Sequence, residues 1–402
     1  MKILFLSTWF PYPPDQGCKI RAYHMLKALA EQHETVLLSF QDGPIEPAWL
    51  EHLGGLCRSV EVVGRDPFAA GRNGRLRGWL SLKPSSVVAT HSAEMARRAR
   101  VLAARWQPDR IMALTFVTAP YALAANQACR RAACVVDVDN LLTRMLQESY
   151  QRAGSAVSRL RRGLAWWKFR RYERWLYGRF DLCLTVSELD RRTLLGLLNG
   201  GRGRVEIVPN GVDAGHNRPG LAPPEADTLV YNGALTYSAN YEAMEYFLGR
   251  VFPRIRAHVP GARLRITGRT EGVALERLAL NGNVSLTGYL KDARPVVAGS
   301  WACVVPLLRG GGSRVKILEA MALGTPVVST SKGAEGLDVT DGRHLLLADS
   351  PDRFAEQTAR LLRDPGLRSA LAAAARRLVV DRYQWGDIGA RVCGLMENCR
   401  RS

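Results

Sequence analysis

The feature that most constrains the fold of this chain is an alternation of short apolar runs with segments of helical periodicity. The first run, residues 2–10, is followed by a loop and then by apolar residues at helical spacing, Ala22, Met25, Leu26 and Leu29. Further apolar runs occur at 35–40, 59–63, 110–116, 133–138 and 182–186. Such alternation predicts a parallel sheet that is covered by helices on both faces.

The same pattern restarts after a proline-rich segment at 218–227, which we interpret as a linker. Strands are expected at 228–232, 262–267, 284–286, 301–307, 326–329 and 345–347, with a helix near 241–258. The predicted fold class is therefore α/β, with two Rossmann-like doubly wound parallel-sheet domains facing a cleft. We place the first domain at 1–208 and the second at 209–382, and expect residues 383–402 to pack back on the first.

A glycine loop leads into a helix between two apolar runs of the second half. Residues 310–312 are all glycine, Ser313 is a candidate N-cap, and Gly324 followed by Pro326 ends the helix. Arg314 and Lys316 lie in the first turn, where a cation is disfavoured by about 0.3–1 kcal/mol. A bound anion would reverse this effect, so the loop predicts a phosphate site.

Glu319 lies three residues after Lys316 and shares its helix face, which places a carboxylate beside the expected anion. The alternative interpretation of the loop is a glycine-rich surface turn with solvated basic side chains.

The chain is strongly basic, with 56 Lys and Arg residues against 37 Asp and Glu in 402 residues and a formal net charge of +19. This charge predicts attraction to nucleic acid, to an anionic membrane or to phosphorylated substrates. Basic and aromatic residues alternate through 155–180, which suits an anionic membrane surface, although a solvated crossover helix is the alternative. No helix-turn-helix, RNP motif or zinc finger is present, so a nucleic acid partner is not expected.

Eight cysteines without a Cys-x-x-Cys pair predict reduced thiols and no structural metal. The sequence has no run of about 18 apolar residues and no signal-peptide pattern. We expect a cytoplasmic protein, with peripheral contact at the inner face of the cytoplasmic membrane through 155–180.

Several motifs resemble those of glycosyltransferase family 4 (group 1), which has the GT-B fold. They are Asn210-Gly211-Val212-Asp213, Tyr231-Asn232-Gly233 with Asn240, and the run from Glu319 to Val328. The sequence is most similar to bacterial exopolysaccharide sugar transferases associated with the PEP-CTERM and exosortase system. This closer resemblance involves Pro13–Gly17 with Ile20-Arg21, Asp137-Val138-Asp139-Asn140, residues 310–316 and Gly333–Gly336.

The resemblance implies a metal-independent, retaining hexosyltransferase that moves a sugar from a nucleotide-sugar donor to a lipid-linked or growing saccharide. Arg314 and Lys316 would bind the diphosphate and stabilise the leaving charge without a cofactor, and Glu319 would bind the ribose hydroxyls. Asp139 and Asn140 are the polar candidates on the acceptor side. The remaining candidates for donor binding are Gly17, Gly233, Gly268, Tyr289, Gly311, Gly312 and Ser313.

The chain departs from the family pattern at three places. Gly311 stands where a second glutamate is usual, eight positions before Glu319. The segment 233–237 lacks the usual basic pair, so Arg314 and Lys316 would take over that role. Residues 115–118 lack the histidine that many relatives carry on the acceptor side.

Three other interpretations stay open at this point. Asp137-Val138-Asp139 is an Asp-x-Asp pattern, which metal-dependent transferases of another fold use to hold a divalent ion. A nucleotide-sugar epimerase has the same scaffold but needs acid/base groups that are scarce here. The chain could also be a non-catalytic membrane-docking protein that retains a nucleotide site.

Overall fold

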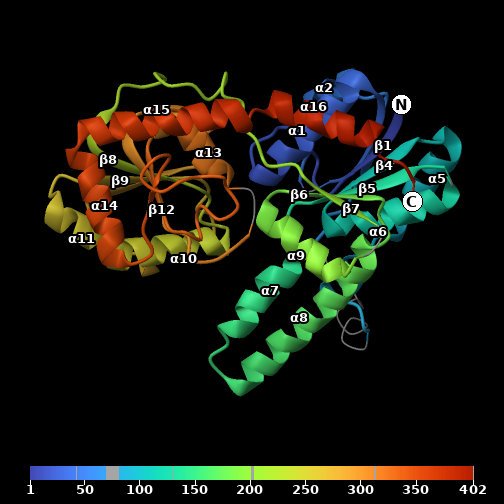
Figure 1. Ribbon diagram of the computed structural model, residues 1–402, viewed down its shortest axis with the longest axis horizontal. Coiled ribbons are helices and arrows are strands. Elements are labelled where there is room, and N and C mark those ends of the chain that lie inside the picture. The colour runs from blue at the N-terminus through green and yellow to red at the C-terminus, as the bar shows by residue number, and fades with distance from the viewer. Residues whose placement is uncertain (42, 69–80, 130, 201–202, 312–313, 402) are drawn as a thin grey trace. The chain divides into compact units, whose positions relative to one another are not determined.

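The computed structural model describes the whole chain except residues 42, 69–80, 130, 201–202, 312–313 and 402 (Figure 1). The chain forms two compact units. Unit 1 comprises Met1–Pro209, Gly311–Ser313 and Ile388–Ser402, and unit 2 comprises Asn210–Gly310 and Arg314–Asp387. Each unit is described by itself below.

Unit 1 is built on a parallel sheet with the strand order β3-β2-β1-β4-β5-β6-β7. The strands are β1 (Lys2–Ser7), β2 (Glu34–Phe40), β3 (Ser59–Val63), β4 (Arg110–Leu114), β5 (Ala133–Val138), β6 (Leu182–Thr185) and β7 (Arg204–Ile207). The helices are α1 (Gly17–Gln32), α2 (Pro47–Leu56), α4 (Ser85–Thr90), α5 (Ala93–Trp106), α6 (Thr115–Ala128), α7 (Leu142–Gln151), α8 (Ala156–Tyr177) and α9 (Glu188–Leu198).

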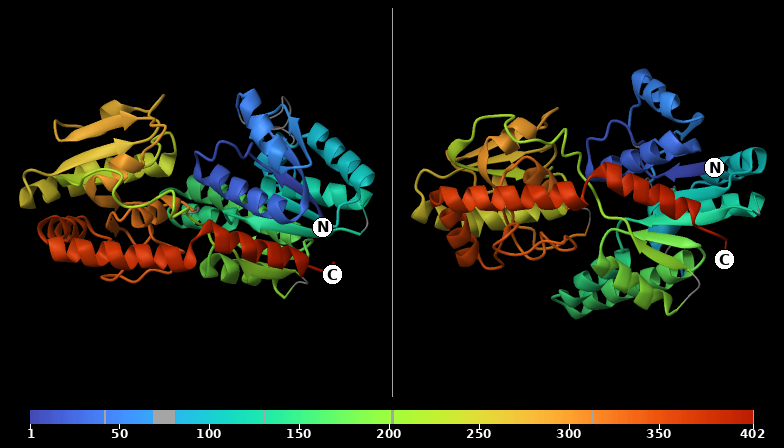
Figure 2. Two further views of the ribbon diagram at one scale, coloured as in Figure 1. Left: turned by 90° about the horizontal axis from the view of Figure 1, so that it is seen from above. Right: turned by 45° about the horizontal axis from the view of Figure 1, so that its top comes forward.

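Helices cover both faces of this sheet (Figure 2). Alternate strand residues such as Leu4 and Leu6 pack with buried residues of α5 and α6, among them Met95 and Tyr121. The residues between them, such as Phe5, are also fully buried. Strands that are buried on both faces explain why the apolar runs of the sequence are nearly continuous.

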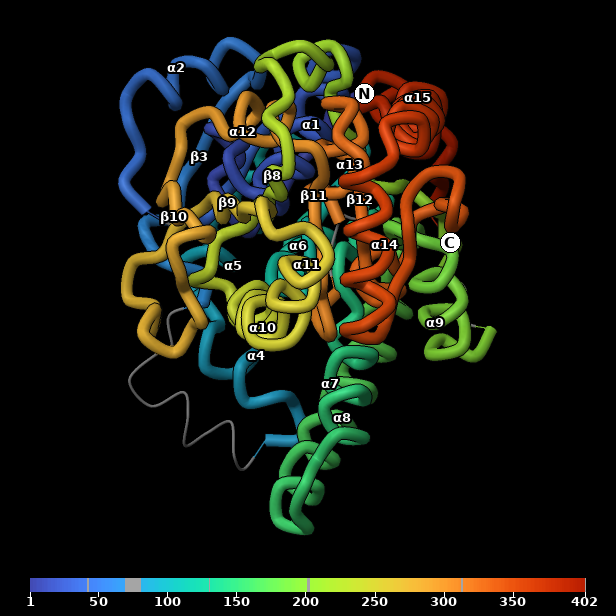
Figure 3. Tube along the Cα trace, turned by 90° about the vertical axis from the view of Figure 1, so that its left-hand side faces the viewer, coloured from blue at the N-terminus to red at the C-terminus, as the bar shows by residue number. Residues whose placement is uncertain are grey.

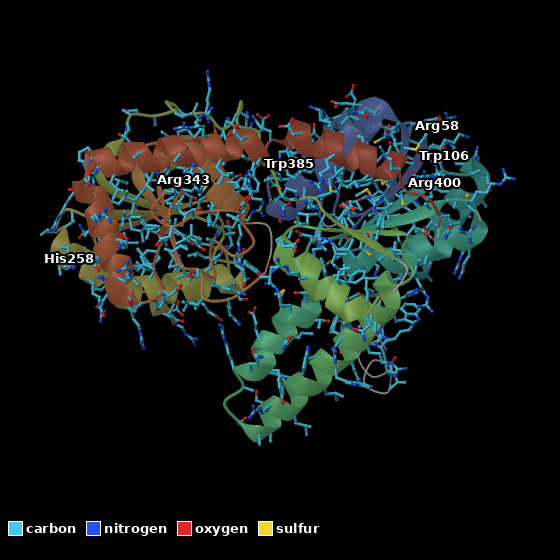
Figure 4. The ribbon with its side chains drawn as sticks, in the orientation of Figure 1. Arg58, Trp106, His258, Arg343, Trp385 and Arg400 are labelled. Atoms are coloured by element: carbon cyan, nitrogen blue, oxygen red, sulfur yellow. The ribbon has the colours of Figure 1, made fainter. Side chains whose placement is uncertain are left out.

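The last helix, α16 (Trp385–Glu397), begins at Trp385 (Figure 4) and from Ile388 onward belongs to unit 1. Its Cys393 thiol donates to the Ala28 carbonyl of α1 at 3.3 Å, and the Arg110 Nε donates to the Met396 carbonyl at 2.8 Å. Val392 and Met396 are fully buried. Residues 388–402 therefore complete a face of the first sheet.

Arg58 lies directly before strand β3, and Trp106 lies shortly before strand β4. Both residues are therefore at the amino edge of the first sheet. Arg400, which follows α16, lies at the same end of the unit (Figure 4). The opposite, carboxyl edge of the sheet is where ligands of open α/β sheets bind.

Unit 2 has a second parallel sheet with the order β10-β9-β8-β11-β12-β13. Its strands are β8 (Glu225–Asn232), β9 (Arg263–Thr267), β10 (Val284–Gly288), β11 (Ser300–Val305), β12 (Val327–Ser329) and β13 (Leu346–Leu347). Its helices are α10 (Ser238–Tyr246), the π-helical η1 (Phe247–Val251), α11 (Phe252–His258), the short 3-10 helix η2 (Leu275–Arg277), α12 (Arg294–Ala298), α13 (Val315–Ala322), α14 (Pro351–Arg363) and α15 (Pro365–Arg382).

The two faces of the second sheet have separate cores. On one face, Leu229 and Tyr231 of β8 pack with Phe247, Phe252 and Phe354 from η1, α11 and α14. On the other face, the core joins β8 and β11 to residues of α13 and α15, among them Val230, Val305, Leu318, Met321 and Val379. Helix α13, which carries the predicted anion site, is thereby fixed against the sheet by its buried stripe.

The predicted fold class of both halves is confirmed, since each half is a doubly wound parallel sheet. Two local predictions were wrong. Strand β7 was not expected, because Arg204 and Glu206 alternate with only two apolar residues. The single helix expected at 241–258 is three segments, since a π-helical turn and Pro253 interrupt the α-helix.

Candidate functional site

The predicted anion-binding helix is present as α13, and Arg314 occupies its N-cap position. The backbone of Arg314 is left-handed, with φ 48° and ψ 22°, which is uncommon outside glycine. We expected Ser313 to be the N-cap, and this is wrong because Arg314 occupies that position. Gly312 and Ser313 lie outside the described residues. Strain of this kind is concentrated at functional sites.

The Arg314 side chain is buried, with 6% exposure, and connects two loops to the start of α13. One guanidinium nitrogen donates to the carbonyls of Gly310 at 3.0 Å and Lys332 at 2.8 Å. The same nitrogen lies 3.9 Å from the Glu335 carboxylate, which also pairs with the Lys332 ammonium at 2.8 Å. The cation is thus held in place by the protein rather than extended into water.

Lys316 turns toward the end of β8 instead of toward solvent. Its ammonium donates to the Tyr231 hydroxyl and to the Asn240 side-chain oxygen, both at 3.0 Å, and lies 4.3 Å from the centre of the Tyr231 ring. The Tyr231 hydroxyl in turn donates to the same Asn240 oxygen at 2.7 Å. Burial lowers the pKa of the Lys316 ammonium to about 8, because the charged form loses water.

Two predicted glycines make room for this arrangement. A Cβ at Gly233 would lie 2.5 Å from the Lys316 ammonium, so a side chain here would displace that cation from its observed position. Gly268 has φ 113°, and a Cβ there would lie 2.6 Å from the Ala234 backbone nitrogen. Both residues follow directly on strand ends, which brings the loops after β8 and β9 into contact.

Glu319 lies one turn after Lys316 and faces the ends of β8 and β9. Asn232 donates its amide to the Glu319 carboxylate at 3.3 Å, and the Thr267 hydroxyl donates to the Asn232 oxygen at 2.9 Å. Burial raises the pKa of the Glu319 carboxyl to about 7. Lys316 and Glu319 share a helix face, as predicted, but they bind different partners.

Two further candidates lie in loops of the second half of the chain. Tyr289 follows β10, is half exposed, and has the guanidinium of Arg269 4.9 Å from the centre of its ring. Gly311 lies in the connection from β11 to α13. The hydrogen bonds described above for Arg314, Lys316 and Glu319 are made to other residues.

The candidates of unit 1 lie at the carboxyl edge of the first sheet. Gly17 is the first residue of α1, and Asp139 and Asn140 follow β5, where the Asn140 amide donates to the Asp139 carboxylate at 3.3 Å. Asp137 accepts from Arg21 Nε at 2.8 Å and from a terminal nitrogen of Arg21 at 2.5 Å, with both side chains only 2% exposed.

The Arg21 pairing occupies both oxygens of Asp137, which removes this carboxylate from the Asp-x-Asp metal interpretation. Among the described residues, no three His, Cys, Asp or Glu side chains gather in a way that could hold a metal ion.

One residue of unit 1 was missed by sequence reasoning. Thr115, the first residue of α6 after β4, has φ 65°, which is a rare conformation for a β-branched residue. Its hydroxyl lies 2.9 Å from that of Thr8, which donates to the Leu114 carbonyl at 2.8 Å. The sequence offered no signal for this backbone conformation, since threonine gives no hint of a left-handed residue.

The geometry of unit 2 suits one chemical task. Arg314, Lys316 and Glu319 come together with Gly233 and Gly268 where β8, β9 and β11 end, at the start of a helix. The first N–H groups of a helix have no partner within it, and two fixed cations add to their positive potential. The fold and the site together define an α/β protein with two fixed cations and a carboxylate at the start of a helix, an arrangement that suits an anion.

Two family models match this chain. The model "Glycosyl transferase 4-like domain" matches residues 16–211, and the model "Glycosyl transferases group 1" matches residues 226–364. Each half of the chain therefore matches a glycosyltransferase model, and the chain belongs to the glycosyltransferases of GT-B fold.

One curated relative and two solved structures are informative. The phosphatidyl-myo-inositol mannosyltransferase of Mycolicibacterium smegmatis is 31% identical over 224 residues, which are 53% of this chain and 56% of the relative. The chain thus spans a little over half the length of that relative.

The sucrose-phosphate synthase of Thermosynechococcus elongatus has a TM-score of 0.73 at 16% identity and covers 99% of this chain and 98% of its own. Anabaena HepE, solved in complex with UDP and glucose, has a TM-score of 0.68 at 18% identity and covers 99% of both chains. These two likenesses concern the fold.

Proposed function

We propose that this protein is a retaining, metal-independent glycosyltransferase that moves a hexose from a nucleotide-sugar donor to a lipid-linked or growing saccharide in bacterial exopolysaccharide biosynthesis. The observation that carries the proposal is the pair of fixed cations at the start of α13. Arg314 is buried with its guanidinium anchored on two carbonyls, and Lys316 is anchored on Tyr231 and Asn240. No water has to be reorganised to present these charges to a diphosphate.

In the proposed reaction, the bond between the sugar's anomeric carbon and the diphosphate oxygen breaks. Arg314 and Lys316 stabilise the negative charge that develops on that oxygen. The acceptor hydroxyl attacks the same face of the sugar, and its proton leaves with the nucleoside diphosphate. Glu319, held by Asn232, accepts hydrogen bonds from the ribose hydroxyls.

The acceptor side is assigned to the carboxyl edge of the unit 1 sheet, where Asp139, Asn140 and Thr115 lie. A lipid-linked acceptor places the reaction at the inner face of the cytoplasmic membrane, with the enzyme attached peripherally. No helix in the described part of the chain is long and apolar enough to cross a bilayer.

A donor screen tests the proposed function. Purified protein is incubated with radiolabelled UDP-, GDP-, ADP- and dTDP-sugars, together with a lipid extract from a polysaccharide-producing bacterium. We expect one donor to give a labelled lipid-linked product whose anomeric configuration, determined by NMR, matches that of the donor. Absence of both transfer and donor hydrolysis for every sugar would contradict the proposal, and an inverted product would contradict retention.

The pKa values of the site predict how donor affinity depends on pH. The Glu319 carboxylate becomes protonated below pH 7, and the Lys316 ammonium loses its proton above pH 8. The affinity for a nucleotide sugar should therefore be highest between about pH 7 and 8 and approach a tenfold loss per pH unit on each side. Titration calorimetry from pH 5.5 to 9.5 measures this profile.

Two variants test which residue causes each limb of that pH profile. Lys316→Met should remove the alkaline limb, and Glu319→Gln should remove the acid limb, because each deletes one titrating group. An alkaline limb that persists in Lys316→Met would show that another group binds the diphosphate.

A further inference from the structure

The feature of unit 1 that donor chemistry does not use is the antiparallel hairpin formed by α7 and α8. Figures 1 and 3 show it extending away from the sheet of unit 1. At about 1.5 Å per residue, α8 is roughly 33 Å long. From Ala156 to Arg171, all of which the structure describes, none of its side chains is buried, and Tyr172 is the first that is. The distal part of α8 therefore has a solvent face along its length.

That solvent face carries large apolar side chains. They follow the helical spacing i, i+3, i+7, i+10 and are 80%, 77%, 51% and 47% exposed, in the order Val157, Leu160, Leu164 and Trp167. We call these four residues the apolar stripe. Soluble proteins rarely expose such a continuous row unless it meets a partner.

The side of α8 that packs against α7 is a different one. Trp166 stacks on Tyr150 of α7 with ring centres 5.6 Å apart, and a Cβ at Gly163 would lie 3.1 Å from the same Tyr150 ring. At about 100° per residue, Trp166 lies roughly 100° or more around the helix from every member of the apolar stripe, and Gly163 lies between Trp166 and the edge of the stripe. The stripe is therefore not needed to hold the hairpin together.

The charge of the hairpin is almost entirely positive. Residues 142–177 contain nine Arg and Lys side chains and two acidic ones, Glu148 and Glu173. Glu173 is fully buried and accepts the backbone N–H groups of Leu142 and Thr143, both at 3.0 Å, so it contributes no surface charge. The basic residues one turn after members of the stripe, and therefore on its face, are Arg161, Lys168 and Arg171.

We propose that the outer face of α8 docks on an anionic phospholipid bilayer. The helix would lie parallel to the surface, with the apolar stripe at the boundary between headgroups and acyl chains and the flanking cations among the anionic headgroups. This proposal deepens the proposed function, because a lipid-linked acceptor is presented at such a surface.

A bilayer fits this face better than a second copy of the chain does. Two such faces would bring two strongly basic surfaces together, and like charges repel at close range. An anionic bilayer complements this face, because its negative headgroups attract the basic side chains and its apolar layer accepts the apolar stripe. Trp167 is also a residue type enriched at membrane interfaces.

Vesicle flotation of the full-length protein tests the proposal. The vesicles contain phosphatidylcholine with 30% phosphatidylglycerol, or phosphatidylcholine alone, at 100 mM salt. We expect the protein to float with the anionic vesicles and to stay at the bottom of the gradient with the neutral ones. Equal flotation with both, or none with either, would overturn the proposal.

Two double variants and their controls show whether this face is responsible. Leu160→Ser with Leu164→Ser should reduce the partition coefficient at least tenfold, because two apolar side chains are lost from the interface. Arg161→Gln with Arg171→Gln should reduce it about 30-fold, at about fivefold per charge.

The controls make the same chemical changes on other helices of unit 1. Leu189→Ser with Leu195→Ser alters exposed leucines of α9, and Arg100→Gln with Arg105→Gln alters exposed arginines of α5. Controls that lose as much binding as the α8 variants would refute a specific docking face.

Two further measurements distinguish self-association from membrane docking, and failure of docking from failure of the proposed enzymatic function. If the stripe were a self-association surface, the serine variant would lower the molar mass measured by light scattering while vesicle binding stayed unchanged, and the proposal would fall. Transfer to a water-soluble acceptor should be equal in wild type and in both α8 variants, and only transfer to vesicle-borne acceptor should fall. Flotation without any transfer would leave docking in place and contradict the enzymatic function instead.

Discussion

Replacing Lys316 by methionine should lower kcat/KM for sugar transfer about 10²- to 10³-fold, because a single donor aimed at a developing oxyanion has this effect in other enzymes. Methionine retains the apolar length of lysine, so the contact with the Tyr231 ring is kept while the charge is lost. Initial rates with the donor identified in the screen measure the effect. Melting temperature within a few degrees of wild type would show that the fold is intact.

Gly233→Ala tests the same cation without deleting it. The added methyl group would lie 2.5 Å from the Lys316 ammonium, so the cation has to move from its position against Tyr231 and Asn240. We expect donor affinity to fall well below that of Gly282→Ala, a control in unit 2 where nothing lies within 4 Å of the added Cβ. Equal affinity of the two alanine variants would contradict the assigned position of Lys316.

Replacing Arg21 by methionine should destabilise unit 1 by about 3–5 kcal/mol, because it leaves the buried Asp137 carboxylate without its cation. Arg21 also donates to the Pro209 carbonyl at 3.1 Å, a contact that is lost as well. Hydrogen exchange of amides in β1 and β5 measures the effect in unit 1 separately from unit 2.

The double variant Arg21→Met with Asp137→Asn should recover part of this stability, since no unpaired charge stays buried. Arg97→Met serves as the matched control, because Arg97 forms an exposed pair with Glu94 on α5 that water screens, and its loss should change the stability little. An Arg21 variant as stable as the Arg97 variant would show that the buried pair is not important for the unit.

The parts of the fold that depend on local pattern could be predicted from the sequence. The apolar runs located β3 and β5 to the residue, and β5 is buried along its whole length, so it needs no alternation. Strand β7 was not predicted, because the sequence of an edge strand that contains Arg204 and Glu206 resembles that of a loop. The π-helical turn at Phe247–Val251 has no sequence signal in an apolar helix.

The sequence indicated which residues are candidates for the site, but it did not indicate which partners their side chains contact. Misplaced charges at a helix start identified Arg314 and Lys316, because this conflict depends on local sequence alone. The direction in which Lys316 points depends on Tyr231, which is 85 residues away and becomes a neighbour only because β8 pairs with β11. The pairing of Arg21 with Asp137, 116 residues apart, likewise required the order of the strands.

The return of residues 388–402 to unit 1 affects how the chain folds during synthesis. Residues 210–387 leave the ribosome before the segment whose Val392 and Met396 complete the core of unit 1. Unit 2 can therefore close first, which reverses the usual order of N-terminal domains before later ones. Until translation passes Met396, the face of α1 around Ala28 lacks the cover that α16 gives it in the folded protein.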